Sequence, residues 1–348
     1  MVIIKIIILY INVQKIFKEV VMRKYIKYFV SVMILFFIIV INCNVVNATL
    51  DISLSENEYK EYLKRESTGK VYTITKESNT ITEVDKETLV QNISVKFKSN
   101  NQVQTTTSGF KKENILTTAN VRTIHPNAGN LIRMYRPFYS PYNNVCKITT
   151  AQGEGSGYLV GPNLLLTAAH CFFDEDGNIL DNWTCYPSYE YGMYNNLRSG
   201  WQEATFGDWA SSGSAQGDWC VVRLDWNMGD EIGWIGCQSY GTNAEMNEMV
   251  VHSAGYPNTD QNDVNNYTYI TQIYNGECQY YSPGNISQTY NGHFEMSAYP
   301  VFGMSGGPIV NWSTDMAVGI NHAMLNNVKT GIGCRIHQEI INVILSYM

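Results

Sequence analysis

Short apolar runs alternate with turns along the chain from residue 114 onward. The runs are rich in Val, Ile, Leu and Tyr, and the turns between them carry Gly, Asn, Asp and Pro. Many short strands with such turns are typical of an all-β sandwich or barrel. The predicted strands are residues 145–149, 156–160, 164–168, 220–224, 248–252, 267–273 and 316–320.

The C-terminus departs from this pattern. Apolar side chains stand at positions 336, 340, 341, 344 and 345, which is the spacing of one helical face. The sequence therefore predicts a β protein that ends in a helix over residues 336–348.

Residues 49–113 differ from the region that follows them. Twenty of these 65 residues are charged, Thr and Ser are abundant, and strand-like pieces such as residues 71–75 are few. A segment of this composition buries little apolar surface. It is either a disordered spacer or, given the chemistry further along the chain, a pro-segment removed on activation; we favour the pro-segment.

Residues 1–48 have the pattern of an export signal. Basic residues follow Met22, a possible true start, an apolar run covers residues 29–41, and small residues end at Ala48. This order is that of a secretory signal peptide. The alternative is a membrane anchor, but the run of about 13 residues is shorter than the ~20 that span a bilayer. We therefore expect a secreted protein without stable membrane association.

Charge excludes one class of partner. Residues 114–348 contain 8 Lys and Arg against 20 Asp and Glu, a net charge of −12. A surface this acidic repels phosphate backbones, so nucleic acid is not expected as a partner.

Seven cysteines follow the export signal, and an oxidising compartment would let them pair. An odd number leaves at least one thiol unpaired or bonded to another molecule. Cys220 is the candidate, because it lies in an apolar strand pattern where a buried thiol is inert. Cys171 is expected to pair with Cys185, closing a loop of about 15 residues worth roughly 3 kcal/mol.

Two local motifs carry the chemistry. Residues 165–171 read Leu-Leu-Thr-Ala-Ala-His-Cys, so an apolar strand ends in small residues that leave room for the imidazole of His170. Residues 302–308 read Phe-Gly-Met-Ser-Gly-Gly-Pro, a turn whose glycines present the hydroxyl of Ser305. The N–H groups of Gly303 and Ser305 could hold a developing oxyanion there, typically worth ~3–4 kcal/mol.

The acidic side chain that would act together with His170 and Ser305 has two candidates, because Gly-Asp-Trp occurs at residues 207–209 and again at 217–219. A loop follows Asp208, whereas the strand Cys-Val-Val-Arg-Leu follows the Trp after Asp218. A carboxylate that orients a His must be rigid and largely buried. We therefore assign the role to Asp218 and interpret Asp208 as a surface turn residue.

These motifs, in the order His…Asp…Ser, resemble those of the chymotrypsin-like serine proteases. The sequences around them, together with Ala-Gly-Tyr-Pro at 254–257, look like the bacterial glutamyl-endopeptidase branch. The resemblance implies a chymotrypsin-like double six-stranded antiparallel β-barrel with the site between the barrels. Residues 114–235 would form the first barrel with His170 and Asp218, and residues 236–348 the second with Ser305 and the C-terminal helix.

The same resemblance bears on processing. Arg122-Thr123 is similar to a pair near the mature N-terminus of that branch, which places the start of this mature chain near residues 113–115. Met304 precedes Ser305, so the Asp that pairs with a new α-amino group in trypsin-like zymogens is missing. We expect the pro-segment to silence the enzyme by covering the cleft or by holding the new N-terminus away.

The residues expected to determine substrate specificity differ from those of the glutamyl-endopeptidase branch. Members that cut after glutamate present a His in a Gly-Ile-His stretch, but here Asn321 takes that place and His322 follows. Asn321 and His322 are nevertheless the candidate substrate-binding residues. Neighbours in a strand point to opposite faces, so His322 reaches the pocket only if a bulge re-aims it. Pro300 stands where the branch usually has Thr or Ser, and Tyr299 where the trypsin branch keeps an Asp.

Residues 174–178 read Asp-Glu-Asp-Gly-Asn and resemble part of a calcium loop. Such a loop needs more oxygen ligands and a closing Glu, so we interpret the segment as an acidic surface turn and expect neither a metal nor another cofactor.

The expected protein is a monomeric, secreted serine endopeptidase that acts on protein or peptide substrates, with a preference for Glu as one possibility. The alternatives are a protease of the same fold with apolar or other specificity and a non-catalytic secreted binding protein. Loss of a catalytic residue or of the glycines beside Ser305 would favour the binding protein, and all of them are present.

Overall fold

A computed structural model describes the fold. The described residues are 52–54, 58, 61, 65–87, 106, 130–135, 141–174, 176–192, 197–267, 270–325 and 329–348. The predicted signal peptide (1–48) and the predicted mature start (113–115) lie outside the described residues.

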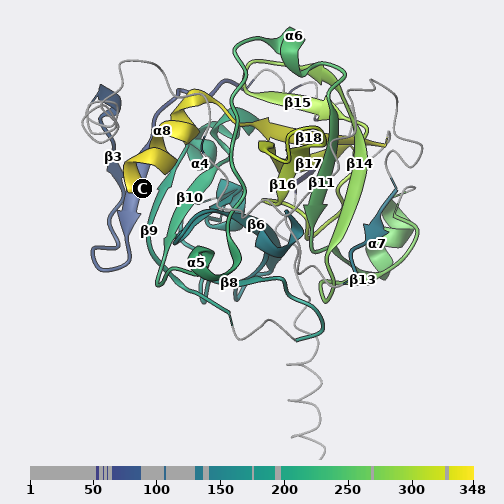
Figure 1. The fold of residues 1–348 in the computed structure, drawn as a ribbon, viewed down its shortest axis with the longest axis horizontal. Helices are drawn as coiled ribbons and strands as arrows, with labels where there is room; N and C mark the ends of the chain where they lie inside the picture. The colour runs from purple at the N-terminus through teal and green to yellow at the C-terminus, as the bar shows by residue number, and fades with distance from the viewer. Residues whose placement is uncertain are drawn as a thin grey trace, which may run out of the picture. The chain divides into compact units, whose positions relative to one another are not determined.

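The first barrel is a ring of antiparallel strands (Figure 1). Its strands are β5 (Val145–Thr149), β6 (Glu154–Gly161), β7 (Leu164–Thr167), β8 (Thr184–Pro187), β9 (Trp201–Phe206) and β10 (Cys220–Leu224). They are hydrogen-bonded in the order β9-β10-β7-β6-β5-β8. An isolated bridge between Cys185 of β8 and Ser199, just before β9, draws the two ends of this row together.

The second barrel is closed. Its strands are β11 (Val250–Gly255), β14 (Tyr280–Thr289), β15 (His293–Met296), β16 (Pro308–Asn311), β17 (Ala317–Leu325) and β18 (Thr330–Arg335). They follow the order β17-β16-β11-β14-β15-β18, and the pairing of β17 with β18 completes the ring. The prediction of two six-stranded antiparallel barrels is confirmed.

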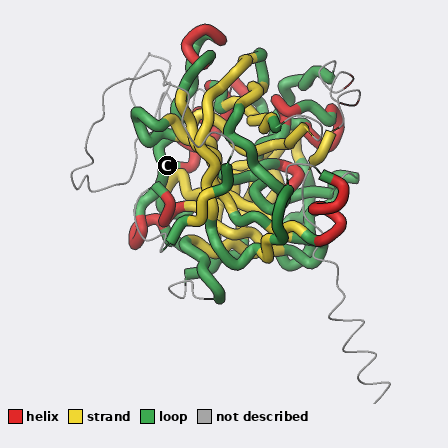
Figure 2. Tube along the Cα trace, turned by 90° about the vertical axis from the view of Figure 1, so that its right-hand side faces the viewer, coloured by secondary structure: helices red, strands yellow, loops and turns green. Residues whose placement is uncertain are grey.

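Shorter elements join these strands and lie mostly around them, as the red segments of Figure 2 show. They are β4 (Ile132–Arg133), η1 (Tyr142–Asn144), η2 (Ala169–Cys171), α4 (Trp209–Ser212), η3 (Ala215–Gly217), α5 (Gly229–Ile232), α6 (Asn243–Met246), β12 (Asn258–Thr259), α7 (Gln261–Asn266) and β13 (Tyr274–Asn275). One predicted strand is wrong: the described part of residues 267–273 is irregular, because α7 ends at Asn266 and pairing resumes only in β13.

Helix α8 (Gln338–Tyr347) confirms the predicted C-terminal helix. Its apolar face, which includes Ile340, Ile341 and Ile344, is buried in one cluster with Leu164 and Val221 of the first barrel. The chain therefore leaves the second barrel and ends against the first, beside β10 (Figure 1). Since this contact buries large aliphatic side chains from both barrels, it stabilises their arrangement.

The region 49–113 contributes more to the fold than its composition suggests. Strands β2 (Tyr72–Thr75) and β3 (Thr82–Glu83) form a hairpin, and β2 pairs with β9 of the first barrel. Val71 and Ile74 are fully buried in the core. The expectation of a segment that buries little apolar surface is therefore wrong for this hairpin, because a mostly polar segment needs only a few apolar side chains on its inner face to extend a sheet.

A third strand of this region, β1 (Ile52–Leu54), pairs with the second barrel instead, in parallel with residues Ala323 to Leu325 of β17. Thr106 also contacts the body of the protein, where its hydroxyl accepts a hydrogen bond from the N–H of Cys237.

Within the described residues, no helix is both long enough and apolar enough to cross a membrane.

Candidate active site

His170 lies where the first barrel ends a strand and turns. Strand β7 is buried along its whole length, and the chain leaves it through Ala168 into the single turn η2. The small side chains of Ala168 and Ala169 are packed into the core, so the turn is close to the barrel wall. The His170 side chain is itself buried, with its ring 5.7 Å from that of Trp209.

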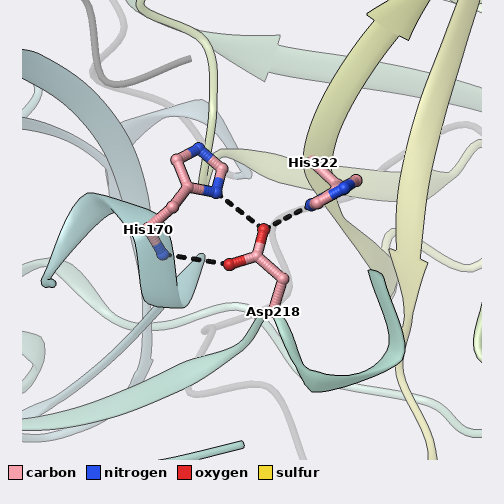
Figure 3. Close-up of side chains that lie close together, drawn as sticks. All are labelled: His170, Asp218 and His322. Atoms are coloured by element: carbon pink, nitrogen blue, oxygen red, sulfur yellow. Dashed lines mark hydrogen bonds and ion pairs between the residues drawn. The ribbon is translucent and has the colours of Figure 1, made fainter. Parts of the chain in front are cut away.

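Asp218 faces His170 across the end of the first barrel. It follows the turn η3 and precedes β10, and it is completely buried. Its Oδ2 accepts a hydrogen bond from Nδ1 of His170 at 2.7 Å, and its Oδ1 accepts one from the His170 N–H at 3.0 Å. Figure 3 shows both contacts, and it also shows the second ring nitrogen of His170 turned away from Asp218.

The same carboxylate contacts a second imidazole. Nδ1 of His322, on β17 of the second barrel, is hydrogen-bonded to Oδ2 of Asp218 (Figure 3). The three side chains are nine-tenths buried or more. Asp218 therefore joins the two barrels through one histidine from each.

Burial and charge act in opposite directions on these groups. Burial opposes protonation of His170, but the Asp218 carboxylate and, more weakly, Cys171 raise the His170 pKa well above its ordinary value. Burial alone would raise the pKa of Asp218, yet the two histidines hold that pKa far below its usual range. Burial lowers the pKa of His322, against the opposing effect of Asp218. Among His170, Asp218 and His322, it is therefore Asp218 that carries a negative charge.

Ser305 lies on a tight turn of the second barrel that presses against the first. Its carbonyl accepts hydrogen bonds from the N–H of Ser156 at 2.7 Å and from the thiol of Cys171 at 3.4 Å. Gly306 has φ +82°, and a Cβ there would lie 2.1 Å from Oγ1 of Thr167, so a side chain at this position would separate the barrels. The turn therefore needs glycine directly after Ser305.

The backbone before Ser305 is closely packed against the segment that contains Tyr256. Gly303 has φ +87°, and a Cβ there would lie 2.3 Å from the carbonyl oxygen of Tyr256, so only glycine fits. In the part of the chain that the structure describes, the Ser305 N–H has no hydrogen-bond acceptor. A substrate oxygen could take that place.

Asn321 is hydrogen-bonded to the turn that carries Ser305. Its backbone N–H donates to Gly307 and its carbonyl accepts from Gly306, each at 2.8 Å. The side-chain Nδ2 donates to the carbonyls of Met304 (3.1 Å) and Ala254 (3.2 Å), and Oδ1 accepts from the Ser253 hydroxyl at 2.8 Å. The amide of Asn321 is therefore engaged within the protein rather than offered to a ligand.

A small pocket opens beside Ser305. Its lining is uncharged and mainly apolar: Pro300, Val301, Phe302, Ser305, Asn321, Ala323 and Met324. The space inside it is about 10 Å³, which is on the order of one water molecule. The pocket as it stands does not admit a large side chain.

The structure corrects the assignment of His322 as a substrate-binding residue. His322 is fully buried, is not among the residues that line the pocket, and contacts Asp218 instead. The register of β17 against β18 shifts between Asn321 and Ala323, but these two neighbours both line the pocket and His322 does not. His322 therefore lies on the opposite face of the strand, as alternation predicts, and contacts Asp218 there. Alternation predicted that His322 misses the pocket, but not that Asp218 lies on the other face.

The interpretation of Asp208 as a surface turn residue is also wrong. Asp208 is 2% exposed, and its carboxylate accepts hydrogen bonds from the Ser67 hydroxyl (2.7 Å) and from the N–H and hydroxyl of Thr68 (both 2.6 Å). Ser67 and Thr68 lie 141 and 140 residues earlier in the chain, in the segment that the sequence predicts to be a pro-segment. No local signal could have revealed them.

The expected Cys171–Cys185 disulfide is not formed. None of the seven cysteines within the described residues is in a disulfide, and all of them are buried. Cys171 contacts the Ser305 carbonyl, whereas the Cys185 thiol is hydrogen-bonded to that of Cys146 on the neighbouring strand β5. Closeness in the sequence suggested Cys171 as the partner of Cys185. Strand β8 pairs with β5 instead, and this pairing brings Cys185 near Cys146.

Two groups could be considered for metal binding. In the cluster of His170, Asp218 and His322, Nδ1 of each imidazole is hydrogen-bonded to Oδ2 of Asp218, whereas a metal at about 2.0–2.2 Å from each ligand would hold the ligand atoms further apart. In the acidic turn, the Asp174 carboxylate accepts hydrogen bonds from Asp176 and Asn178 of its own loop. Both arrangements suit protons rather than a metal.

Comparison with known proteins places this site in a context. The family model described as "Trypsin" matches residues 135–338. The chain is 29% identical over 184 residues to a glutamyl endopeptidase of Bacillus licheniformis, which covers 50% of each chain. It is 31% identical over 86 residues to an extracellular metalloprotease of Bacillus subtilis, covering 23% of this chain and 26% of that protein. The chain thus spans half, or less, of the length of these curated relatives.

Solved structures are similar in fold. A Glu endopeptidase in complex with MPD superposes with a TM-score of 0.51 and 18% identity, covering 61% of this chain and 94% of that chain. At this identity the similarity concerns the fold alone.

Proposed function

Because this chain belongs to the trypsin family, we propose that it is a secreted serine endopeptidase whose catalytic residues are Ser305, His170 and Asp218. One observation carries the proposal: the buried Asp218 carboxylate accepts a hydrogen bond from Nδ1 of His170 and leaves the other ring nitrogen turned away. That nitrogen, Nε2, is buried and has no hydrogen-bond partner within the described residues. A base held in this way is set to accept a proton.

We propose the following reaction, for which the Ser305 hydroxyl must come within hydrogen-bond distance of Nε2 of His170, a contact that the described structure does not make. The Ser305 hydroxyl attacks the carbonyl carbon of the peptide bond while Nε2 of His170 takes the hydroxyl proton. The N–H groups of Gly303 and Ser305 hold the oxyanion of the tetrahedral intermediate. His170 then gives its proton to the leaving amine, and a water molecule hydrolyses the acyl-enzyme by the same route. Asp218 stabilises the imidazolium that forms in each half-reaction.

Labelling with a fluorophosphonate tests this assignment, because the reagent bonds only to an activated serine. We expect the processed wild-type protein to be labelled and the Ser305→Ala variant to remain unlabelled. Asp208→Asn is the matched control, since its carboxylate is buried but belongs to another contact network, and it should be labelled like the wild type. A processed, folded wild-type protein that is not labelled would contradict the proposal and favour a non-catalytic binding protein.

The preference at the cut site has two candidates, each with its own support. Similarity to a glutamyl endopeptidase favours cleavage after Glu. The lining of the pocket favours an uncharged side chain, because no cation is found among its described lining residues and the amide of Asn321 is already engaged. A carboxylate without a partner is expensive to bury, so we propose that the pocket prefers a neutral residue.

Peptides that differ only in Glu or Gln at the cut site separate the two candidates, because the side chains have nearly the same shape. We expect kcat/KM for Gln to exceed that for Glu at neutral pH. Cleavage after Glu should improve relative to Gln as the pH falls and the substrate carboxyl becomes neutral. A clear preference for Glu at neutral pH would establish the glutamyl specificity instead.

We propose that the region 49–113 is a pro-segment and that β1 is its inhibitory part. Strand β16 pairs with β17 only as far as Ile320, and beyond that point β1 covers this edge of β17. Ala323 and Met324, on the covered stretch, line the pocket. An extended substrate that placed a side chain in the pocket would add to this same edge. While β1 stays paired with β17, a substrate cannot pair with this edge.

The hairpin β2–β3 behaves differently under this proposal, because it is part of the first barrel. After cleavage near residues 113–115 it would remain bound through the buried Val71 and Ile74 and through the hydrogen bonds to Asp208. Mass spectrometry of the purified active enzyme under native and denaturing conditions tests this. We expect a non-covalent fragment that contains residues 65–87; an active enzyme without it would refute retention of the hairpin.

Secretion is supported by the export signal of residues 1–48 and fits the extracellular location in the name of the Bacillus subtilis relative. Protein and peptide substrates follow from the proposed reaction, and we propose that the enzyme acts as a monomer.

A further inference from the structure

His322 is a buried imidazole that the proposed reaction does not use. It lies on β17 of the second barrel, while Asp218 and His170 belong to the first. Its neighbours Asn321 and Ala323 both line the pocket, whereas His322 lies on the other face of the strand and contacts Asp218. The residue is fully buried, so contact with solvent or substrate does not explain its position.

The protons in this cluster can be placed by counting donors. An ionised carboxylate only accepts hydrogen bonds, so each Nδ1 that contacts Oδ2 of Asp218 must carry a proton. This determines the same tautomer for His170 and for His322. With the His170 N–H on Oδ1, the carboxylate has three donors, and one of them comes from the other barrel.

We infer that His322 is a positioning residue for the proposed catalytic triad, a second imidazole that holds the Asp218 carboxylate in place for His170. The inference rests on the proposed function and adds a residue to it. Among the described residues, His322 is not part of the pocket lining. It acts through Asp218, because it fixes the carboxylate across the boundary between the barrels and its N–H stabilises the negative charge.

Removal of this donor should change how strongly Asp218 binds the His170 proton. With one donor fewer, more negative charge remains on the carboxylate to attract that proton, so the pKa of His170 should rise further. Since the reaction needs neutral His170, the acid limb of the kcat/KM profile should move to higher pH. Within the described residues, the other titratable groups that interact with this cluster are Cys171, which raises the pKa of His170, His293, whose pKa His322 lowers, and Cys220 and Cys334, whose pKa values Asp218 raises.

Two variants separate the donor from the side-chain volume. His322→Leu fills a similar volume without a donor, whereas His322→Asn places an N–H at nearly the same distance from the backbone as Nδ1. We expect kcat to fall about 10- to 100-fold in the Leu variant, the range for loss of a hydrogen bond to a charged group, with KM little changed. The Asn variant should recover most of kcat and return the acid limb toward its wild-type position.

His252→Leu is the matched control. His252 is a buried imidazole on β11 of the same barrel, and its ring packs against Tyr142, Tyr281 and Trp312. This variant should lose stability without a shift of the acid limb. If folded His322→Leu keeps wild-type kcat and acid limb, or shows the same kinetics as His252→Leu, the inference is wrong.

A measurement on the wild-type chain covers the case in which the Leu variant does not fold. Nitrogen-15 NMR should show Nδ1–H protons on both His170 and His322, with two proton resonances at low field, one of which His322→Asn removes. An Nε2–H tautomer for His322 with an unprotonated Nδ1 would overturn the inference. Fluorophosphonate labelling of the wild type is read separately: if it fails, the proposed function fails, whatever the state of His322.

Discussion

The two Gly-Asp-Trp segments, residues 207–209 and 217–219, have the same sequence and opposite surroundings. They lie side by side, since the N–H of Gly207 donates to the carbonyl of Trp219, and both aspartates are buried. Asp218 is bound by two imidazoles, one from each barrel. Asp208 is bound by hydroxyl and backbone donors of Ser67 and Thr68, which belong to the proposed pro-segment.

The difference shows that the chemistry of a buried carboxylate depends on its partners. Imidazoles can gain and lose protons near neutral pH, so the carboxylate beside them can direct a proton transfer. Hydroxyl and amide groups neither gain nor lose a charge in this range, so Asp208 can only stabilise the segment that it binds. Four predictions test this comparison.

The largest effect is expected from Asp218→Asn. The amide would present an N–H to His170 and favour the wrong tautomer, so kcat should fall by about 10⁴ at neutral pH. Asp208→Asn should change kcat by less than an order of magnitude. Steady-state kinetics of the two processed variants measure this, and the reverse ranking would exchange the roles of the two aspartates.

Asp208→Ala should act on stability instead. The variant leaves the donors of Ser67 and Thr68 without their acceptor, which should cost on the order of 1–3 kcal/mol. Urea denaturation of the full chain should show a lower midpoint, and residues 65–87 should dissociate from the processed enzyme more readily. An unchanged midpoint together with a retained fragment would mean that the contacts of Asp208 contribute nothing.

Gly217→Ala tests the close approach of the two segments. A Cβ at Gly217 would lie 2.2 Å from Oδ1 of Asp208 and 2.9 Å from the N of Trp209, so the segments must move apart. We expect a loss of roughly 1–3 kcal/mol, as for other overpacked sites. Gly241→Ala is the control, because its Cβ would meet only Glu245, at 3.7 Å. Equal unfolding midpoints for the two variants would contradict the packing argument.

The smallest effect is expected at the surface of the hairpin. Lys70 and Glu83 form an ion pair at 2.9 Å, but about half of each side chain is exposed (50% and 54%). Water and salt screen such a pair, so Lys70→Ala should leave the unfolding midpoint of the chain unchanged within error. A salt-dependent fall of the midpoint in the wild type, absent from the variant, would show that the pair matters.

Local patterns predicted much of the fold and of the candidate site. The strand predictions at residues 145–149 and 220–224 coincide with β5 and β10, and the helical spacing near the C-terminus became α8. The pairing of His170 with Asp218 rather than with Asp208 also followed from local features, since a buried strand directly after Asp218 makes that position rigid. These properties depend on residues close together in the sequence.

The strand and helix patterns by themselves therefore predicted an all-β fold that ends in a helix, and the resemblance of the motifs to the chymotrypsin-like serine proteases implied the double barrel. The tertiary structure alone decided that β2–β3 extends the first barrel, that Cys185 lies beside Cys146, that Asp208 binds Ser67 and Thr68, and that His322 faces Asp218. The physical reason is the same in each case. Strand and turn formation depends on neighbouring residues, whereas the partner of a buried polar group depends on register, bulges and packing between segments that are far apart in the chain.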